Sequence, residues 1–355
     1  MLRPLLVVLL AFISLSAEEP SLETLRTQGH WKQLRPRIEG WYRAKPEDPY
    51  AQLWMSRLKQ AFGDPPGSLE LARKAAAARP EDPDIQAQLG FVAGQSAGQA
   101  DGKLAQFSLA REMKKALETA LPARLGDENV RNILVTFYLQ APALIGGGEG
   151  KAKELAQRVA RDLPADGLLL EARIAFHGKH LEAARGLIQQ ALARDPRNYN
   201  AHLTLARYHL SLKPQALDAA LGCYRQALAT RPEGITAHAQ IAAILAEQGK
   251  WAEFEEALAQ ARRACPENLF PYYAAGTNLI AEGKHLDRAE PLLRVYLGQA
   301  PEGNMPDHAA VHWQLGLLFE KLGRKPDAVK ELELAVRLRP KFLQAQKDLE
   351  RLRKG

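Results

Sequence analysis

Aromatic residues are scarce in this chain of 355 residues, at 7% of the sequence, and no convincing run of alternating β-branched and polar residues is present. Such runs are the usual sign of β-strands. Ala and Leu are abundant instead, and this composition predicts an all-α protein. The length favours stacked repeats over one compact core, because in a repeat protein each unit contacts only its neighbours.

Motifs for catalysis are also missing. The sequence has no Ser-His-Asp order, no zinc-protease helix and no nucleophile elbow, so we predict that the protein is not an enzyme and needs no cofactor. His177 and His180 are three residues apart, but Gly178 favours a helix end between them and no further ligands complete a metal site. A nucleic-acid recognition motif is absent too, so we predict no nucleic acid among the partners.

Cysteine is limited to two residues, Cys223 and Cys265. An oxidising compartment would allow the two thiols to pair. Their positions need not bring the two Cα atoms within the roughly 7 Å that a disulfide requires. Two buried thiols are favoured, and a disulfide stays the alternative.

Long hydrophobic runs are absent after the first residues of the chain. Arg3, the apolar run Leu5–Leu15 and the small residues that end at Ala17 have the features of a cleavable signal peptide, residues 1–17. An apolar run of about 11 residues is shorter than the roughly 20 that span a bilayer, so we predict no transmembrane span in the mature chain. The predicted location is extracytoplasmic: the periplasm in a Gram-negative source, with secretion as the alternative.

The charge of the chain is moderately basic. The formal net charge of +7 falls to +6 when Arg3 is removed with the leader. Lys and Arg are dispersed beside Glu and Asp, which is typical of a solvated surface. Such a balance still permits weak contact with an anionic lipid or a cell-wall polymer.

The clearest pattern lies between Ala309 and Pro340. Apolar residues recur there at three- and four-residue steps in two segments separated by Gly323, which we expect to take a positive φ and end the first helix. Pro340 cannot continue the second helix. Two short helices joined by a tight turn cannot bury their apolar faces alone, so the pattern predicts stacked neighbours.

This stretch resembles a tetratricopeptide repeat. The family pattern is Trp-x2-Leu-Gly-x2-Tyr, then Ala-x3-Phe, a second Ala and a closing Pro. The residues that occupy these positions are His312, Leu315, Gly316, Phe319, Ala328, Leu332, Ala335 and Pro340. The Trp position departs from the family pattern, because Trp313 comes one place later. The resemblance implies a right-handed superhelical solenoid of antiparallel helix pairs.

Prolines repeat this unit along the chain. Pro164, Pro196, Pro232, Pro266, Pro301 and Pro340 stand 32, 36, 34, 35 and 39 residues apart. These steps are close to the family period of about 34 residues. The unit that begins at Ala165 is expected to have a short first helix. Phe254 replaces a small Ala where two helices should approach closely, which predicts a wider crossing or a register shift.

The repeat phase divides the chain into five segments. They are the signal peptide (1–17), degenerate N-terminal helical repeats (18–122), a helix pair with a Gly-rich insertion loop (123–164), the tetratricopeptide array (165–340) and a capping helix (341–355). The loop 141–150 lacks the hydroxyl residue and the preceding strand of a phosphate-binding loop. We expect it to be a long turn that folds back over the concave face.

The resemblance also implies a partner-binding face. In this family the first helix of each repeat lines a concave surface, and its second, fifth, ninth and twelfth positions point into it. Transferred to this chain, these positions give Leu203, Arg207, Leu210, Phe270, Tyr273, Thr277, Ile280, Trp313 and Leu317. Several are apolar, as expected of a binding surface. Alternatively the capping helix or the next repeat covers Trp313 and Phe270, and both arrangements remain open.

We therefore predict a non-enzymatic scaffold or adaptor of the cell envelope that binds a protein or peptide through its concave face. The identity of this partner is not encoded in any motif. Two alternatives remain open. One is a binder of an envelope polymer or anionic lipid, and the other is a small-ligand-binding subunit associated with a transporter, with its ligand near residues 141–150.

Overall fold

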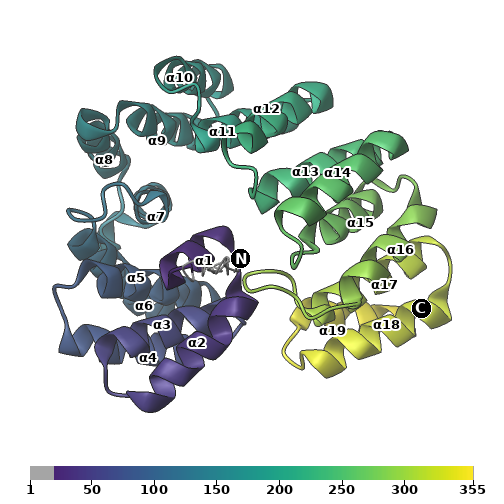
Figure 1. The fold of residues 1–355 in the computed structure, drawn as a ribbon, viewed down its shortest axis with the longest axis horizontal. Coiled ribbons are helices and arrows are strands. Elements are labelled where there is room, and N and C mark those ends of the chain that lie inside the picture. Colours follow the sequence, from purple (N-terminus) through teal and green to yellow (C-terminus); the bar gives the residue numbers. More distant parts are fainter. Residues whose placement is uncertain (1–19, 355) are drawn as a thin grey trace, which may run out of the picture.

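The computed structural model describes residues 20–354, so the predicted signal peptide at residues 1–17 lies outside the described part of the chain. Between residues 20 and 354 the chain forms nineteen α-helices, one 3-10 helix and no strand, which confirms the all-α prediction (Figure 1). None of the helices in this range is both long and apolar enough to cross a membrane.

The helices have the following bounds in chain order: α1 (Leu22–Gln28), α2 (Trp31–Ala44), α3 (Pro49–Ala61), α4 (Pro65–Ala78), α5 (Pro83–Gln99), α6 (Lys103–Ala120), α7 (Glu128–Gln140), η1 (Ala143–Ile145), α8 (Glu149–Asp162), α9 (Pro164–His177), α10 (Leu181–Arg194), α11 (Tyr199–Ser211), α12 (Leu217–Thr230), α13 (Ile235–Glu247), α14 (Trp251–Ala264), α15 (Phe270–Glu282), α16 (Leu286–Leu297), α17 (His308–Lys321), α18 (Lys325–Leu338) and α19 (Leu343–Lys354).

Successive helices pack as pairs, and the pairs follow one another around a curve (Figure 1). Local signals set the helix ends. Asp82 accepts hydrogen bonds from the first amides of α5, and Asp127 does the same for α7. Gly323 follows α17 with a φ of 72°, as predicted from the sequence. The predicted solenoid of helix pairs is confirmed.

Small residues let the two helices of a pair approach closely. Gly316 of α17 faces α18, and a Cβ at this position would lie 2.7 Å from Cγ of Leu332. That separation is too short for a carbon contact, so only glycine fits between the helices here. The family pattern places a glycine at this position for this packing reason.

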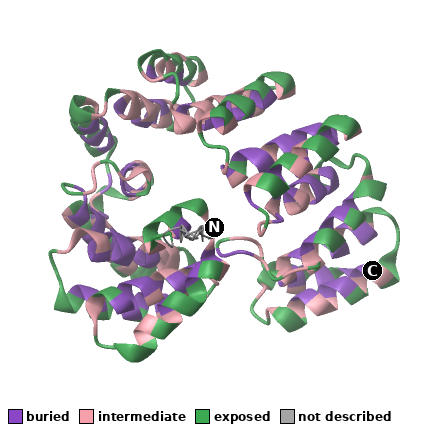
Figure 2. Ribbon diagram, viewed as in Figure 1, coloured by how far each residue is buried: buried purple, intermediate pink, exposed green. Residues whose placement is uncertain are grey.

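Buried apolar residues form a series of clusters along the curve (Figure 2). The first cluster runs from Leu25 to Ala61, and the largest runs from Leu203 to Leu352. Each cluster is built from helices that are close in sequence. No apolar cluster of the described residues joins the N-terminal helices to the C-terminal array, as expected for a solenoid.

One detail of the array differs from the expectations, and a second excludes one of the two alternatives given for Phe254. The first helix of the unit at Ala165 is not short, because α9 extends over 14 residues. Gly167 near its start packs against α8, where a Cβ would lie 2.5 Å from Cβ of Ala160. Phe254 causes no register shift, since it is the fourth residue of α14 just as Ala289 is the fourth residue of α16. It is buried, at 2% exposure, with its ring edge-on to Trp251.

The Gly-rich loop takes a compact path beside α6 rather than over the concave face. Residues 143–145 form η1, and an Arg111 guanidinium on α6 donates to the carbonyl of Leu144. Gly147 touches the carbonyl of Ala141 so closely that a Cβ would overlap it. The amide of Gly148 donates to the carbonyl of Tyr138 at 2.7 Å, which ties the loop back to the end of α7.

The two cysteines are free thiols in the structure. Cys223 is half-buried on α12, and Cys265 is buried just after α14. The thiol of Cys265 donates a hydrogen bond to the carbonyl of Glu233 at 3.3 Å. The sequence favoured two buried thiols; both are unpaired in the structure, but only Cys265 is fully buried.

The curve closes on itself, which the sequence did not predict. The connection between α16 and α17 (298–307) reaches across to the N-terminal helices (Figure 1). The amide of Asn304 donates to the carbonyl of Ala61 at the end of α3, at 2.7 Å. The solenoid is therefore a ring rather than an open arc.

Candidate functional site

The first helix of each pair lines the inner side of the ring. Figure 1 shows α7, α9 and α11 facing the centre, whereas α8 and α10 lie outside. Farther along, α13, α15 and α17 enclose a groove of about 510 Å³. We call it the array groove, and its lining includes Gln240, Ala243, Phe270, Tyr273, Thr277, Ile280, Gln314 and Leu317.

One wall of the array groove is aromatic. The ring of Phe270 stacks on that of Tyr273, with centroids 6.1 Å apart and planes 20° from parallel. The Tyr273 ring also packs against the Tyr296 ring, with the two centroids 5.4 Å apart. Burial raises the pKa of the Tyr273 phenol. The wall is therefore an apolar surface built from stacked rings, and Tyr273 adds one hydroxyl to it.

Two glutamine side chains flank this wall. Gln240 on α13 and Gln314 on α17 are half-buried, and their amides make no hydrogen bond with other residues of the range 20–354. A side-chain amide both donates and accepts, as does a peptide unit. The array groove therefore combines an apolar wall with two free amides.

The structure brings five of the predicted site residues together in this groove. They are Phe270, Tyr273, Thr277, Ile280 and Leu317. Ile280 is only 2% exposed and supports the wall from behind. Phe270 is half-buried and accessible from the groove. For Phe270, the alternative of burial under a neighbouring element is thus excluded by the structure.

Trp313 lies elsewhere. Its indole Nε1 donates to the Asp348 carboxylate on α19 at 2.8 Å, and its ring is edge-on to Phe342 at 5.4 Å. The capping helix covers this side chain. Of the two arrangements left open for Trp313, the structure shows the one in which it anchors the cap.

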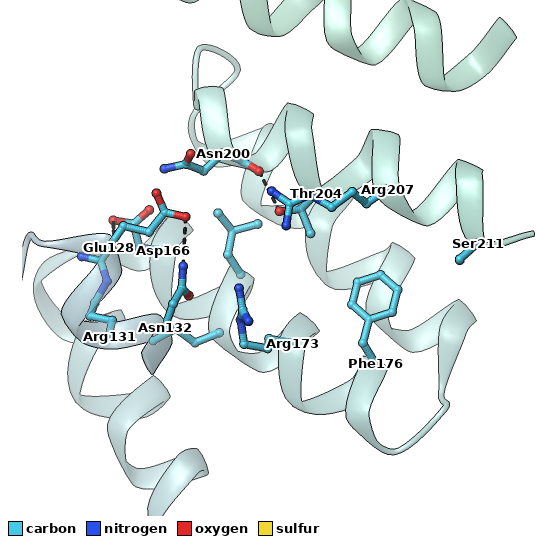
Figure 3. Close-up of a pocket in the computed structure, with 12 residues that line it drawn as sticks. Glu128, Arg131, Asn132, Asp166, Arg173, Phe176, Asn200, Thr204, Arg207 and Ser211 are labelled. Carbon is cyan, nitrogen blue, oxygen red and sulfur yellow. Dashed lines mark hydrogen bonds and ion pairs between the residues drawn. The ribbon is translucent and has the colours of Figure 1, made fainter. Parts of the chain in front are cut away.

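The predicted residues of α11 do not form one surface. Leu203 is buried in the array core, and Leu210 packs against that core. Arg207 alone is exposed, and it lines a second cavity of about 300 Å³ between α7, α9 and α11. We call this cavity the arginine pocket (Figure 3).

At one end of the arginine pocket the charges are already paired. The Arg131 guanidinium is buried, donates to the carbonyl of Leu125 at 2.6 Å and pairs with Asp166 at 2.9 Å. The Asn132 amide donates to Glu128 at 3.0 Å. These contacts leave little capacity for a further ligand at this end.

At the other end two guanidinium groups lack a carboxylate. Arg207 forms no ion pair with residues 20–354, and the single hydrogen bond of Arg173 goes to the Thr136 hydroxyl at 3.4 Å. Figure 3 shows both side chains directed into the pocket, with Phe176 beside them. Burial, together with the positive charge of Arg207, lowers the pKa of Arg173. This end of the pocket is suited to an anion next to an apolar group.

Sequence reasoning missed Arg173, Gln240 and Gln314. Arg173 is the ninth residue counted from Ala165, the same position that selected Arg207 in the following repeat. The repeat position therefore pointed to Arg173, but this residue was not assigned to the concave face because the first helix of its unit was expected to be short. No group of three or more His, Cys, Asp or Glu side chains within residues 20–354 is placed to hold a metal ion.

Comparison with known families agrees with the repeat geometry. Residues 273–341 match the family model described as Tetratricopeptide repeat. This part of the chain is a tetratricopeptide repeat region. Such repeats are generally scaffolds for protein interactions and are not typically enzymes. A comparison with curated proteins finds no match.

Solved structures with similar helical arrays were also found. A thermophilic tetratricopeptide repeat protein of Thermus thermophilus is 21% identical with a TM-score of 0.38, over 53% of this chain and 98% of that chain. Yeast Tom70 is 14% identical with a TM-score of 0.46, over 93% of this chain and 86% of that chain. YrrB, described as having an unusual peptide-binding site, is 17% identical with a TM-score of 0.34, over 55% of this chain and 97% of that chain.

Proposed function

We propose that this protein is a non-enzymatic scaffold of the cell envelope that holds an extended peptide segment of a partner protein in the array groove. The observation that carries the proposal is the composition of this groove. Three successive first helices bring the Phe270–Tyr273 wall together with the free amides of Gln240 and Gln314. Apolar side chains of a guest pack on the wall, and its peptide units bond the two amides.

The arginine pocket adds a preference for acidic guests. Arg173 and Arg207 lie on the same inner side of the ring as the groove and have no carboxylate partner among the described residues. A guanidinium group binds a carboxylate through two parallel hydrogen bonds. A guest whose acidic side chain lies next to an apolar one is complementary to both this pocket and the neighbouring Phe176.

The envelope location rests on the features of residues 1–17, with their positive, apolar and small-residue parts in order. Such a leader directs export and is removed. Sequencing the N-terminus of the protein isolated from a periplasmic fraction tests this point. A mature chain beginning close to Glu18 supports export, and a chain that retains Met1 in the cytoplasm contradicts it.

The groove is tested by blocking it with a single side chain. Thr277 lies half-buried in the middle of the groove lining, so Thr277→Arg fills the space that a guest would use. Peptides are selected on the wild-type protein from a random library displayed on phage, and their affinity is measured by fluorescence polarisation. We expect the variant to bind at least about tenfold more weakly, a change of about 1.4 kcal/mol.

The matched control is Ala252→Arg, which adds the same side chain at an exposed position of α14. This control should bind the selected peptides as the wild type does. Circular dichroism establishes that both variants keep their helices. Equal binding by the Thr277 variant and the wild type would show that the peptides do not use the groove.

A further inference from the structure

The contact that closes the ring is made by an unusually long connection. Residues 298–307 span ten positions between α16 and α17, whereas residues 231–234 and 339–342 connect their repeats with four. We call residues 298–307 the latch loop. The length of the latch loop accounts for the step of 39 residues from Pro301 to Pro340, which is the longest step in the series.

The latch loop supplies a cap that α2 lacks. His30 precedes α2 and makes no side-chain hydrogen bond to its first turn. The Glu302 carboxylate takes this place, accepting from the amide of Lys32 at 2.6 Å and from that of Gly303 at 3.1 Å. A carboxylate stabilises a helix N-terminus because it satisfies free amides and complements the helix dipole. The cap comes from the opposite end of the chain.

Lys32 and Gln33 extend the contact to the neighbouring loop. The Lys32 ammonium donates to the carbonyls of Glu267 at 3.1 Å and Ala300 at 3.2 Å. The Gln33 amide donates to the Glu267 carboxylate at 2.6 Å. The first turn of α2 is therefore bonded to both the latch loop and the connection between α14 and α15.

Trp31 and Gly303 pack closely against each other. Trp31 is 7% exposed, and a Cβ on Gly303 would lie 2.6 Å from its Cγ. The backbone of the latch loop lies directly on the indole for this reason. Any larger residue at position 303 would force the loop away from α2.

The contact is nevertheless thin and polar. The N-terminal apolar cluster ends with α3 and its partly buried neighbour Phe62, and the array cluster begins at Leu203, so no shared apolar core of the described residues spans the closure. Glu302 is 4% exposed, and its Oε2 has no hydrogen-bond partner among the described residues. Burial raises the pKa of this carboxyl group, since its charged form is poorly solvated. Small polar contacts of this kind open more easily than packed cores.

We propose that the latch loop is a releasable gate: it holds the solenoid closed on α2, and its release opens the ring and admits the guest to the inner face. The repeats contact only their neighbours, so the ring can open without unfolding any pair. The role in guest entry rests on the proposed function. The closure itself does not, and it is measured without a guest.

Closure is tested by small-angle X-ray scattering of the purified protein alone. The wild type should scatter as a closed ring. Lys32→Ala removes two hydrogen bonds of the contact, and Gly303→Leu inserts a side chain beneath Trp31, so both variants should show a larger radius of gyration. Lys45→Ala is the matched control, because this lysine is exposed at the other end of α2. It should scatter as the wild type does.

Guest entry is tested by stopped-flow association with the peptides selected on phage. In a gated ring only the open fraction binds, so the association rate should rise in Lys32→Ala and stay unchanged in Lys45→Ala. An open wild type, or variants as compact as the wild type, would overturn the latch whether or not any peptide binds. Altered scattering with an unchanged association rate would overturn the gate. If the wild type scatters as a closed ring but no peptide binds it, the proposed function is overturned and the latch is not.

Discussion

At the scale of single residues, Arg173 and Arg207 stand out because they line one cavity of the inner face together and form no ion pair with residues 20–354. Some exposed cations are paired with a neighbouring carboxylate, such as Arg324 with Asp327 and Arg353 with Glu333. Such exposed pairs contribute little to stability. The carboxylates of the shared cavity, Glu128 and Asp166, are bonded to Asn132 and Arg131. Arg173 and Arg207 therefore have no ion-pair partner among the described residues. Their positive charges repel each other until an anion is bound.

This arrangement predicts a charge-specific loss on substitution of Arg173. Arg173→Gln should weaken the binding of a selected peptide that contains Glu by about tenfold, because a partly buried charge-assisted hydrogen bond is worth roughly 1.5–3 kcal/mol. The same peptide with Gln in place of Glu should bind the variant and the wild type equally. Fluorescence polarisation measures both affinities. Arg158→Gln, at an exposed position on α8, is the control and should leave both unchanged. Equal losses for the two peptides would contradict carboxylate recognition.

The thiol of Cys265 offers a second test at this scale. Burial and the nearby negative charge of Glu233 raise its pKa to about 11. Only the thiolate reacts with iodoacetamide, and at pH 8 a thiol of this pKa is ionised to about 0.1%. The alkylation rate of the folded protein should therefore rise about tenfold per pH unit from pH 8 to pH 10. Peptide mapping by mass spectrometry follows this residue separately from Cys223. A plateau near pH 9 would contradict the raised pKa, and the protein in urea should react as an ordinary thiol.

At the scale of elements, α19 ends the array by covering what would otherwise be an open repeat face. Trp313 connects α17 to this helix through the Asp348 carboxylate and the Phe342 ring. Leu349 and Leu352 complete the contact from the buried side of α19. A terminal helix that is apolar on one face and charged on the other keeps the last repeat soluble.

Truncation of Trp313 should therefore loosen the cap and reduce stability. We expect Trp313→Ala to lower the free energy of unfolding by about 2–3 kcal/mol, through lost packing and an unpaired Asp348. Hydrogen exchange should show faster exchange of the α19 amides before those of α15. Leu343→Ala, on an exposed side chain of α19, should change neither quantity. Unchanged exchange in α19 of the Trp313 variant would show that this residue does not anchor the cap.

The repeats could be predicted from the sequence because their determinants are local. Gly323 and Pro340 mark ends of helices within one repeat, and Gly316 marks a close approach of adjacent helices. The groove residues Tyr273 and Leu317 followed from their positions in that local frame. The length of the 14-residue α9 was underestimated. Gly167 near its start is a poor helix former, but its close packing against α8 outweighs that preference.

At the scale of the whole molecule, the closed ring depends on contacts that no periodic signal encodes. Glu302 and Lys32 are 270 residues apart in the sequence, and neither local sequence indicates that the two residues will be in contact. The step of 39 residues from Pro301 to Pro340 is the longest in the series, but its length does not indicate which residues the connection contacts. Closure places the array groove and the arginine pocket on one enclosed inner face, which is the face proposed to bind the guest.

The most direct test of the account is photo-cross-linking in living cells. A benzophenone amino acid replaces Gln314 inside the array groove, and in a separate variant it replaces the exposed Lys330 on α18. The account predicts discrete cross-links to one or a few envelope proteins from position 314, with none from position 330. Mass spectrometry should locate each cross-link in an extended segment that carries apolar and acidic residues. Cross-links from the outer position alone, or equal cross-linking from both, would contradict binding within the groove.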